Sequence, residues 1–383
     1  MKILHLIYTH GVAGAEKYLL DLLPGLKQYG IQCDVICVCP HAHQSKVQLY
    51  CNRLTEKGIA TQLLPTSRIN LLGVAKKINH YCQTNGIRII HSHLFNSDVL
   101  AVAVKLFFNK KILLLSTKHG YKESYFIDNA DSIGKINYNL YYFVTKFVIG
   151  RIDKNITISK AVADLYYNLK LTPQKMYFIH HGISVDKKII KEKGVQYRVS
   201  TPQLIIAGRL TEIKGHAYLF DAMPEIIKAF PAMQLLVMGE GIEQEALEKK
   251  AAALGVQKHI SFTGFQNNPY SYIEESDIIV LPSLYEPFGL VYIESFALKT
   301  PVIAFDVQAC NEIIVHNENG ILVPVKDSKR LASSIISLLH NPVERERLAD
   351  NGYQKYVSYY NTERMIKDTA VFYKKIQQEG MLY

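Results

Sequence analysis

Two glutamates stand at the ends of a short segment that joins a predicted strand to a predicted helix. The segment Glu286–Glu294 follows the apolar run Ile278–Leu281, and Gly289 falls where the helix should begin. A helix N-terminus offers free backbone N–H groups and a partial positive charge, which suit a phosphate. A carboxylate on either side of such a seat suggests a ligand with hydroxyls at both ends of a diphosphate, the shape of a nucleotide sugar. The alternative is an ordinary capped helix with a solvated glutamate at each end.

The spacing of the two glutamates separates ligand binding from bond cleavage. Eight helical steps cover about 12 Å, whereas the carboxyl pair of a glycosidase sits only ~5–9.5 Å apart. Glu286 and Glu294 are therefore predicted to hold the two ends of one ligand rather than to act together at one bond.

A second loop carries the positive charge that a diphosphate needs. The loop Gly208–Gly215 follows the apolar run Gln203–Ala207 and contains Arg209 and Lys214. These two cations would neutralise a diphosphate and, without a metal, would stabilise the charge on a departing nucleotide. The alternative is a pair of solvated surface cations.

The first half holds a weaker glycine turn and a group of histidines. Gly11–Glu16 follows the run Ile3–Ile7 but has two glycines rather than the three of GxGxxG, so a dinucleotide site is weakly supported. A turn that meets phosphate by its backbone and a plain tight turn both stay open. His91 and His93 share one face of an extended segment, but zinc needs a third ligand and no acidic or cysteine partner lies nearby in sequence, so no metal is expected. His119, before a glycine at a strand end, is better placed as a substrate contact.

Short β-branched runs separated by helix-length segments predict an α/β fold with a parallel sheet in each half. Both halves begin with a strand, a glycine loop and a helix, so we predict two Rossmann-like domains that face each other across a ligand cleft. The charged join Lys187–Pro202 separates them, and the helix-periodic tail Glu363–Gln377 must pack on one of them. The predicted strands are Ile3–Ile7, Cys33–Val38, Ile87–Ile90, Ile112–Ser116, Asn155–Ile158 and Met176–Ile179, then Gln203–Ala207, Gln234–Met238, Ile260–Thr263, Asp277–Leu281, Val302–Phe305 and Ile321–Val323.

Composition fits two globular domains in a reducing compartment. The chain has 383 residues, of which 48% are hydrophobic, and its 6 cysteines lack zinc-type spacing. We expect these cysteines to be buried thiols. The N-terminus predicts a strand rather than a signal peptide, and no run of ~18 apolar residues suggests a spanning helix. A cytoplasmic protein is expected, with the inner face of the cytoplasmic membrane as a further location.

Charge is distributed unevenly along the chain. Residues 1–190 carry a net charge of +13 and residues 191–383 a net charge of −3. A basic first half predicts an anionic partner, such as a membrane surface, an acidic glycolipid or a nucleic acid; lysine-rich solubility is the alternative. The aromatic segment Tyr138–Ile149, with Lys146 within it and Arg151 after it, fits an interfacial helix or a core helix. Of these two, we favour the core helix.

These motifs, in this order along nearly the whole chain, resemble the retaining glycosyltransferases of family 4, which have the GT-B fold. The resemblance implies an N-terminal acceptor domain at residues 1–190, completed by a crossover helix at 363–383, and a C-terminal donor domain at 196–362. The chain departs from the family pattern at Ala13, where a glycine is usual, and at His181, where an asparagine is usual. The matching motifs are Gly14–Glu16, Gly208–Leu210 with Lys214-Gly215, Gly239–Gly241, Phe262–Phe265 and Glu286–Glu294.

The resemblance implies a role for each matched residue. Arg209 and Lys214 would hold the donor diphosphate, Glu294 would accept from the ribose hydroxyls, and Glu286 would accept from the transferred sugar. From the first domain, His119 would approach the phosphate and sugar. The implied catalytic residues are Glu286, Lys214, Arg209 and His119, and the implied donor-binding residues are Gly14, Arg209, Lys214, Gly239, Phe265, Glu286, Phe288, Gly289, Leu290 and Glu294.

The resemblance further implies metal-independent transfer, with no cofactor, of a sugar from a nucleoside diphosphate sugar to an acceptor hydroxyl with retained configuration. UDP is the expected nucleotide, by family frequency. The expected acceptor is a saccharide on a lipopolysaccharide, a glycolipid or another surface polysaccharide, with an anionic membrane surface as a further partner and no nucleic acid. Three alternatives stay open: a nucleotide-sugar epimerase on the same fold, a nucleic-acid-binding protein that uses the basic half, and an inactive transferase kept as a subunit.

Overall fold

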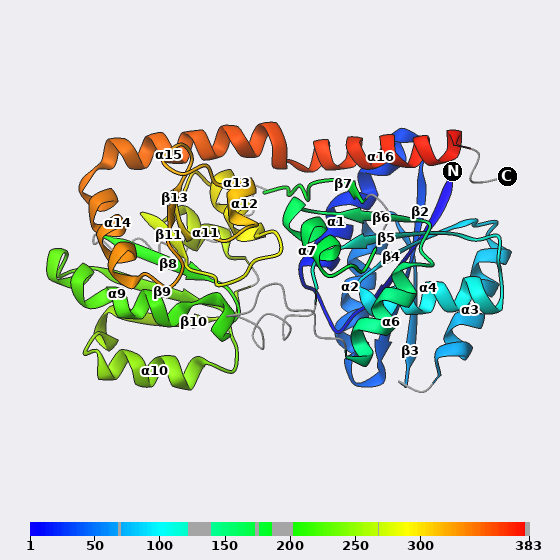
Figure 1. The fold of residues 1–383 in the computed structure, drawn as a ribbon, viewed down its shortest axis with the longest axis horizontal. Helices are drawn as coiled ribbons and strands as arrows, with labels where there is room; N and C mark the ends of the chain where they lie inside the picture. Colours follow the sequence, from blue (N-terminus) through cyan, green and yellow to red (C-terminus); the bar gives the residue numbers. More distant parts are fainter. Residues whose placement is uncertain (68–69, 122–138, 173–175, 186–201, 267, 380–383) are drawn as a thin grey trace. The chain divides into compact units, whose positions relative to one another are not determined.

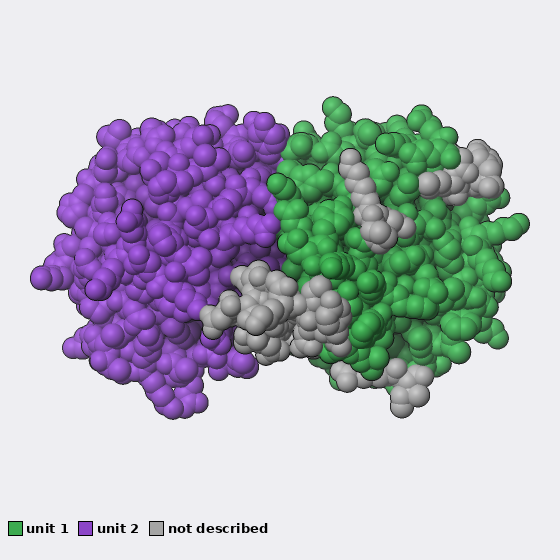
Figure 2. Space-filling model, viewed as in Figure 1, with its two compact units in different colours: residues 1–182, 361–383 green, residues 183–360 purple. Residues whose placement is uncertain are grey.

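The computed structural model describes residues 1–67, 70–121, 139–172, 176–185, 202–266 and 268–379. The chain divides into two compact units, which are coloured separately in Figure 2. Unit 1 comprises residues 1–182 and 361–383, and unit 2 comprises residues 183–360. The predicted pair of parallel-sheet, Rossmann-like domains is confirmed; their facing across a cleft stays a prediction.

Unit 1 is built on a seven-stranded parallel sheet in the order β3-β2-β1-β4-β5-β6-β7 (Figure 1). Alternate side chains of β1 enter hydrophobic cores on opposite faces of the sheet, because Ile3 and Ile7 lie in one cluster and Leu4 and Leu6 lie in another. A sheet that is buried on both faces accounts for the nearly continuous apolar strands of this half. The strands are β1 Lys2–Tyr8, β2 Gln32–Pro40, β3 Ala60–Thr66, β4 Ile89–His93, β5 Leu113–Lys118, β6 Lys154–Thr157 and β7 Tyr177–Phe178. The helices are α1 Gly14–Leu26, α2 Gln44–Glu56, α3 Leu71–Thr84, α4 Phe95–Phe107, α6 Leu140–Ile149, α7 Lys160–Asn168 and α16 Thr362–Gln378, with the short turns η1 Lys27–Tyr29 and η2 His41–His43.

Unit 2 repeats this design with a six-stranded parallel sheet in the order β10-β9-β8-β11-β12-β13. Its core joins the strands to the apolar faces of α9 and α14, which pack against each other. The strands are β8 Gln203–Ala207, β9 Gln234–Met238, β10 Ile260–Gly264, β11 Ile278–Leu281, β12 Val302–Phe305 and β13 Ile321–Val323. The helices are α9 His216–Ala229, α10 Gln244–Ala253, α11 Tyr270–Glu274, α12 Leu290–Ala297, α13 Cys310–Ile313, α14 Ser328–His340 and α15 Pro342–Lys355, with the short turns η3 Glu212–Lys214 and η4 Gln257–His259 and the π-helix η5 Tyr356–Tyr360.

The last helix belongs to the first unit, as the family resemblance implied. Asn361 caps α16 by accepting a hydrogen bond from the N–H of Arg364. The apolar face of α16 then enters the core of unit 1 beside α1, with Met365, Phe372 and Tyr373 all buried. The periodicity of the tail thus predicted the helix, and the crossover to the first unit is confirmed.

Two strand predictions in unit 1 need correction. Strand β3 was not predicted, because Ala60–Thr66 mixes polar and apolar residues and includes Pro65. Since β3 lies at the sheet edge and pairs with β2 alone, it tolerates a proline that a central strand would exclude. Strand β4 runs on from the predicted Ile87–Ile90 to His93, so the two histidines lie within the strand rather than beyond its end.

The prediction of a core helix at Tyr138–Ile149 is wrong for one of its faces. Helix α6 buries Tyr142, Thr145, Val148 and Ile149. The opposite face is exposed among the described residues, with Leu140 at 80%, Phe143 at 55% and Phe147 at 49% of full exposure. Hydrophobicity summed over the segment could not separate a buried helix from one with an exposed apolar face.

The cysteine prediction agrees with the structure. Cys33, Cys37, Cys39, Cys51, Cys82 and Cys310 are free and buried. Those on β2 alternate into the core like the apolar residues beside them.

Candidate functional site

The candidate site of unit 2 lies where its strand order reverses. Strands β8 and β11 are neighbours in the sheet but not in sequence, and ligands of such sheets bind beyond the carboxyl ends of strands at this reversal. The loops that leave β8 and β11 meet there, because the N–H of Leu284 donates to the carbonyl of Ile213 at 2.8 Å. The two loops that sequence analysis singled out are therefore brought to one place.

Glycines allow these loops to approach closely. Gly215 has a φ of +68°, and a Cβ built on it would lie 1.9 Å from the carbonyl oxygen of Pro282. Gly239, after β9, has a φ of +133°, and its Cβ would lie 1.9 Å from the carbonyl oxygen of Gly208. Any other residue would force the backbones apart, so these glycines fix the shape of the site.

Lys214 and Glu286 form an ion pair at the centre of this edge. The Lys214 Nζ lies 2.6 Å from Glu286 Oε2, and the side chains are 20% and 13% exposed. The family resemblance implied that the lysine binds the diphosphate and that the glutamate binds the sugar. The structure puts both at the same point, which suits the junction between a phosphate and the sugar it carries.

Helix α12 presents its N-terminus beside this pair. Gly289 caps the helix with a φ of +91°, and a Cβ there would lie 2.3 Å from the ring of Tyr292 and 3.1 Å from Glu286 Cγ. The first turn, from Leu290, therefore has free N–H groups next to the carboxylate of Glu286. Glu294 lies one turn further along and is buried.

The other predicted donor-binding residues of unit 2 differ in exposure. Arg209 is exposed near the start of the loop after β8, whereas Phe288 is buried against Tyr360. Phe265 is 64% exposed, and its N–H donates to Glu240 at 3.3 Å, so the loop after β10 is tied to the loop after β9. An exposed aromatic ring at this edge is available for a flat ligand group such as a base.

A buried tyrosine lies directly under the α12 turn. The hydroxyl of Tyr292 accepts from the thiol of Cys310 at 2.9 Å. Burial raises the pKa of Tyr292 well above its usual value, and burial also raises the pKa of Cys310 to about 12. Both groups therefore stay neutral and support the turn rather than take part in proton transfer.

Unit 1 has the same strand reversal between β1 and β4. Gly14, the first residue of α1, is exposed at this edge. The carboxylate of Glu16 accepts a hydrogen bond from the N–H of Ala13 at 2.9 Å, so it closes the first turn of the helix. Within the Gly14–Glu16 motif, the glutamate shapes the turn, and only the glycine is open to a ligand.

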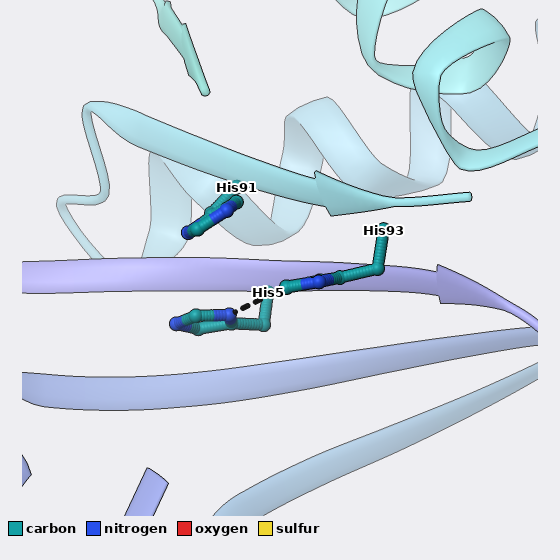
Figure 3. Close-up of side chains that lie close together, drawn as sticks. All are labelled: His5, His91 and His93. Carbon is teal, nitrogen blue, oxygen red and sulfur yellow. Dashed lines mark hydrogen bonds between the residues drawn. The ribbon is translucent and has the colours of Figure 1, made fainter. Parts of the chain in front are cut away.

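His119 follows the last residue of β5 and ends a row of histidines (Figure 3 shows His5, His91 and His93). Its Nε2 lies 3.2 Å from Nδ1 of His93, whose Nε2 lies 3.0 Å from Nδ1 of His5. Desolvation lowers the pKa of His119 and that of His5 to about 3, and it lowers the pKa of His93 well below its usual value. All three rings are therefore neutral at pH 7.

The sequence reasoning missed His5, which lies 88 residues before His93. The sequence offers no acidic or cysteine partner close to His91 and His93, but the structure brings a third histidine to them, because ring nitrogens of all three lie within 4.8 Å of one another. The register of β1 against β4 places His5 directly opposite His91. The available signal was a histidine in the middle of an apolar strand.

A buried ion pair that the sequence reasoning also missed supports the same edge. Lys118 Nζ lies 2.5 Å from Asp98 Oδ2, and both side chains are 3% exposed. The other carboxylate oxygen of Asp98 accepts from the hydroxyls of Ser92 at 2.6 Å and Ser116 at 2.7 Å. This network ties α4 to β4 and β5 just before His119.

Two family models together match most of the chain. The Glycosyltransferase Family 4 model matches residues 12–187, and the Glycosyl transferases group 1 model matches residues 188–355. The chain belongs to glycosyltransferase family 4. The family resemblance drawn from the motifs is thus confirmed.

Known relatives and solved structures agree with this membership. The chain is 32% identical to an uncharacterized glycosyltransferase of Methanocaldococcus jannaschii over 57% of the chain and 59% of the relative. It is 25% identical to a 4-alpha-N-acetylgalactosaminyltransferase of Campylobacter jejuni, which acts on a diphospho-undecaprenol saccharide, over 88% and 89%. Several other curated relatives are matched over only about half of their length, for example 46% and 55%. The crystal structure of Anabaena HepE with UDP-glucose has a TM-score of 0.80, 18% identity, and coverage of 98% of this chain and 100% of that one, which establishes the shared GT-B fold.

Proposed function

We propose that this chain transfers a sugar from a nucleoside diphosphate sugar, a UDP-sugar, to an acceptor hydroxyl with retained configuration. The observation that carries the proposal is the Lys214–Glu286 pair at the N-terminus of α12, at the strand reversal of unit 2. It offers a cation for the phosphate, free N–H groups for its oxygens and a carboxylate for sugar hydroxyls. The UDP-glucose in the similar HepE structure supports the choice of nucleotide.

Each site residue then has a step to perform. Lys214, Arg209 and the first turn of α12 bind the diphosphate and stabilise the charge that develops as the bond between the sugar and the β-phosphate oxygen breaks. The acceptor oxygen bonds to the same face of the anomeric carbon, and its proton passes to the departing phosphate oxygen. Glu286 orients the sugar and Glu294 holds the ribose, so the enzyme contributes mainly position and charge. Because side-chain cations supply the positive charge, we propose that transfer needs neither a metal nor a cofactor.

A hollow in unit 1 is our candidate for the acceptor. It has a volume of about 450 Å³ and lies at the carboxyl ends of β1 to β3, between α3 and α4. Tyr8, Thr66, Ser67, Asn70 and Asn96 provide polar groups beside apolar side chains of the lining, which suits a saccharide. The Asn96→Ala variant is expected to raise the KM of the acceptor and to leave the affinity for UDP unchanged.

The exposed face of α6 supports an acceptor at an anionic membrane surface. Helices α4 and α6 lie side by side, because the Phe95 ring packs against the Tyr141 ring near their starts and Lys105 pairs with Asp153 just beyond the end of α6. The end of α4 therefore adds its own exposed apolar residues to the face of α6. We call the resulting surface the α6 patch: Leu106, Phe107, Leu140, Phe143, Val144 and Phe147.

Positive charge accompanies the α6 patch. The guanidinium of Arg151 lies 3.4 Å from the centre of the Phe147 ring, and Lys146 projects from the same helix. Aromatic rings beside cations, in a half with a net charge of +13, fit the headgroup region of an anionic bilayer. None of the described helices combines the length and apolarity needed to cross a bilayer.

Thermal unfolding with UDP, GDP, ADP and NAD in millimolar excess tests the donor class. A ligand at 100 times its Kd adds ~2.7 kcal/mol of stability, so we expect a raised Tm with one nucleoside diphosphate. That shift should vanish in Arg209→Ala but persist in Lys249→Ala, which removes a cation from the exposed face of α10. No shift with any diphosphate, or a shift with NAD alone, would refute the proposed function. Conversion of the donor without an acceptor would identify an epimerase instead.

Sedimentation with phosphatidylglycerol vesicles tests the membrane contact. We expect binding at low salt that weakens as salt rises. The double variant Phe143→Ser, Phe147→Ser should lose binding, whereas Leu49→Ser, which removes an exposed leucine from α2, should keep it. Absence of wild-type binding at low salt would refute a membrane-bound acceptor and leave the donor site untouched.

A further inference from the structure

Three histidines share one face of the sheet of unit 1. Strand β1 pairs in parallel with β4 so that His5 lies opposite His91 and Ile7 lies opposite His93. Since alternate residues point to the same face, His5, His91 and His93 lie close together on one face of the sheet (Figure 3). This face packs against the core that α1 and α16 cover. Each of the three is completely buried. A buried row of imidazoles at the strand reversal has to satisfy its nitrogens locally.

Two of these rings form a hydrogen-bonded chain with His119. His5 Nδ1 lies 3.0 Å from His93 Nε2, and His93 Nδ1 lies 3.2 Å from His119 Nε2. A neutral imidazole has one N–H donor and one bare acceptor nitrogen. Each link therefore fixes the next, and the chain has only two states, with all N–H groups directed toward His119 or all directed toward His5.

The free end of the chain selects one of these states. His5 Nε2 is buried and has no hydrogen-bond partner among the described residues. Orphaned buried N–H groups are rarer than under-satisfied acceptors, so the bare nitrogen belongs at this end. The Nδ1–H of His5 then donates to His93, and the Nδ1–H of His93 donates to His119. The remaining proton of His119 is on Nδ1, at the carboxyl end of β5.

Metal binding explains the row less well than hydrogen bonding does. Ring nitrogens of His5, His91 and His93 lie within 4.8 Å of one another, but this group includes no carboxylate or thiolate. His91 is already held by the Tyr373 hydroxyl at 2.5 Å and the Thr117 hydroxyl at 2.8 Å. A dication here would be buried among neutral side chains, which is costly.

We propose that His5 and His93 are positioning residues that hold His119 as the neutral Nδ1–H tautomer. His119 is then a fixed hydrogen-bond donor at the ligand-binding edge of unit 1. The proposal deepens the proposed function and rests on it for the ligand, an oxygen of the nucleotide sugar. A donor suits a phosphate or hydroxyl oxygen, whereas the other tautomer would present a lone pair to it. Because the tautomer is set before the ligand arrives, no reorganisation is needed during the reaction.

Nitrogen NMR of ligand-free protein labelled on histidine tests the hydrogen-bonded chain of histidines directly. Long-range coupling between ring protons and ring nitrogens reports which nitrogen carries the proton, and His119→Gln assigns the signal. We expect Nδ1–H on His119 in the wild type and a mixture of tautomers in His93→Leu. His93→Asn should restore the wild-type state, because its amide N–H takes the place of the imidazole Nδ1–H. His80→Leu, which removes an exposed histidine from α3, should change nothing.

The contrary results are equally definite. A proton on Nε2 of wild-type His119, or an unchanged tautomer in folded His93→Leu, overturns the proposal. If His93→Leu does not fold, His5→Phe provides the same test, because it keeps an aromatic ring and removes the first donor. One equivalent of zinc in the purified protein, lost in His5→Phe, would make the rings metal ligands and also overturn it.

Measurements of kcat connect the hydrogen-bonded chain of histidines to the reaction. With a UDP-sugar and an acceptor, His93→Leu is expected to lower kcat by up to about 100-fold, the cost of a misplaced contact to the reacting ligand, and His93→Asn to recover most of it. If His93 had only a structural role, His93→Leu and His93→Asn would both have a lower Tm, and kcat would not recover in His93→Asn. If wild-type His119 carries the proton on Nδ1 but no nucleotide sugar binds, the positioning stands and the proposed function fails.

Discussion

Gly215→Ala should damage both the stability and the nucleotide site of unit 2. The substitution places a Cβ 1.9 Å from the carbonyl oxygen of Pro282, whereas real Cβ atoms essentially never come closer than 3.0 Å. The loops after β8 and β11 must therefore separate by about 1.1 Å, the difference between these two distances. Alanine in the left-handed region adds about 1–2 kcal/mol of its own.

Gly255→Ala isolates the contribution of the close approach. Gly255 has a φ of +70°, close to the +68° of Gly215, but its Cβ would meet nothing within 4 Å. Both variants therefore carry the cost of an alanine in the left-handed region. Only Gly215→Ala adds the cost of moving the backbone, about 1–3 kcal/mol. Displacement of a binding loop by ~1 Å is able to cost up to 10²-fold in activity, and we expect at least a tenfold loss in UDP affinity, about 1.4 kcal/mol.

Urea unfolding measures the loss of unfolding free energy, and titration with UDP measures the loss of nucleotide affinity. The chain has no tryptophan, so unfolding is followed by circular dichroism. With a slope of about 2 kcal/mol/M, the extra cost lowers the midpoint of Gly215→Ala by roughly 0.5–1.5 M relative to Gly255→Ala. UDP affinity should fall in Gly215→Ala alone. Equal midpoints and equal affinities in the two variants would refute the reasoning about the loops.

Three further predictions concern charge. Glu286→Gln keeps the shape of the side chain but loses the ion pair with Lys214, so we expect transfer to fall at least 100-fold while UDP still binds; near-wild-type transfer contradicts the assignment. Asp98→Asn leaves a buried lysine without its partner, and a loss of about 3–5 kcal/mol in unfolding free energy is expected; an unchanged urea midpoint would show that water reaches this lysine. The pKa of buried His5 is lowered from 6.5 to about 3, so the unfolded state binds the extra proton and stability falls as pH drops from 6.5 toward 3. His5→Phe should make the slope of unfolding free energy against pH shallower by about 1.4 kcal/mol per pH unit in this range, and an unchanged slope would place the titration elsewhere.

Much of the fold could be predicted because parallel sheets leave a strong sequence pattern. Strands such as β8 and β11 are short apolar runs followed by glycine or proline loops, so the sequence predicts each strand, whereas the pairing of β8 with β11 is seen only in the structure. Strand β3 escaped prediction because an edge strand is only half enclosed and does not need to be apolar. The exposed face of α6 escaped because composition does not reveal which side of a helix meets solvent.

The site could be predicted only as far as residue types reveal chemistry. Lys214 and Glu286 were both expected to bind the donor, but their direct contact depends on the close approach of two loops at Gly215. The link between His5 and His93 depends on strand register, which a single sequence does not fix. Local motifs thus supplied the predicted ligand-binding residues, while contacts between distant segments became visible only in the structure.

The return of α16 to unit 1 has a consequence for how the chain is made. During synthesis, the core of unit 1 stays open on one side until Met365, Phe372 and Tyr373 have left the ribosome. Unit 2 comes from one continuous stretch, so it is able to close its own core first, although it starts later in the sequence. The half of the chain that is translated first is therefore the half that finishes folding last. Until then, the histidine row beside Tyr373 lacks the helix that covers it.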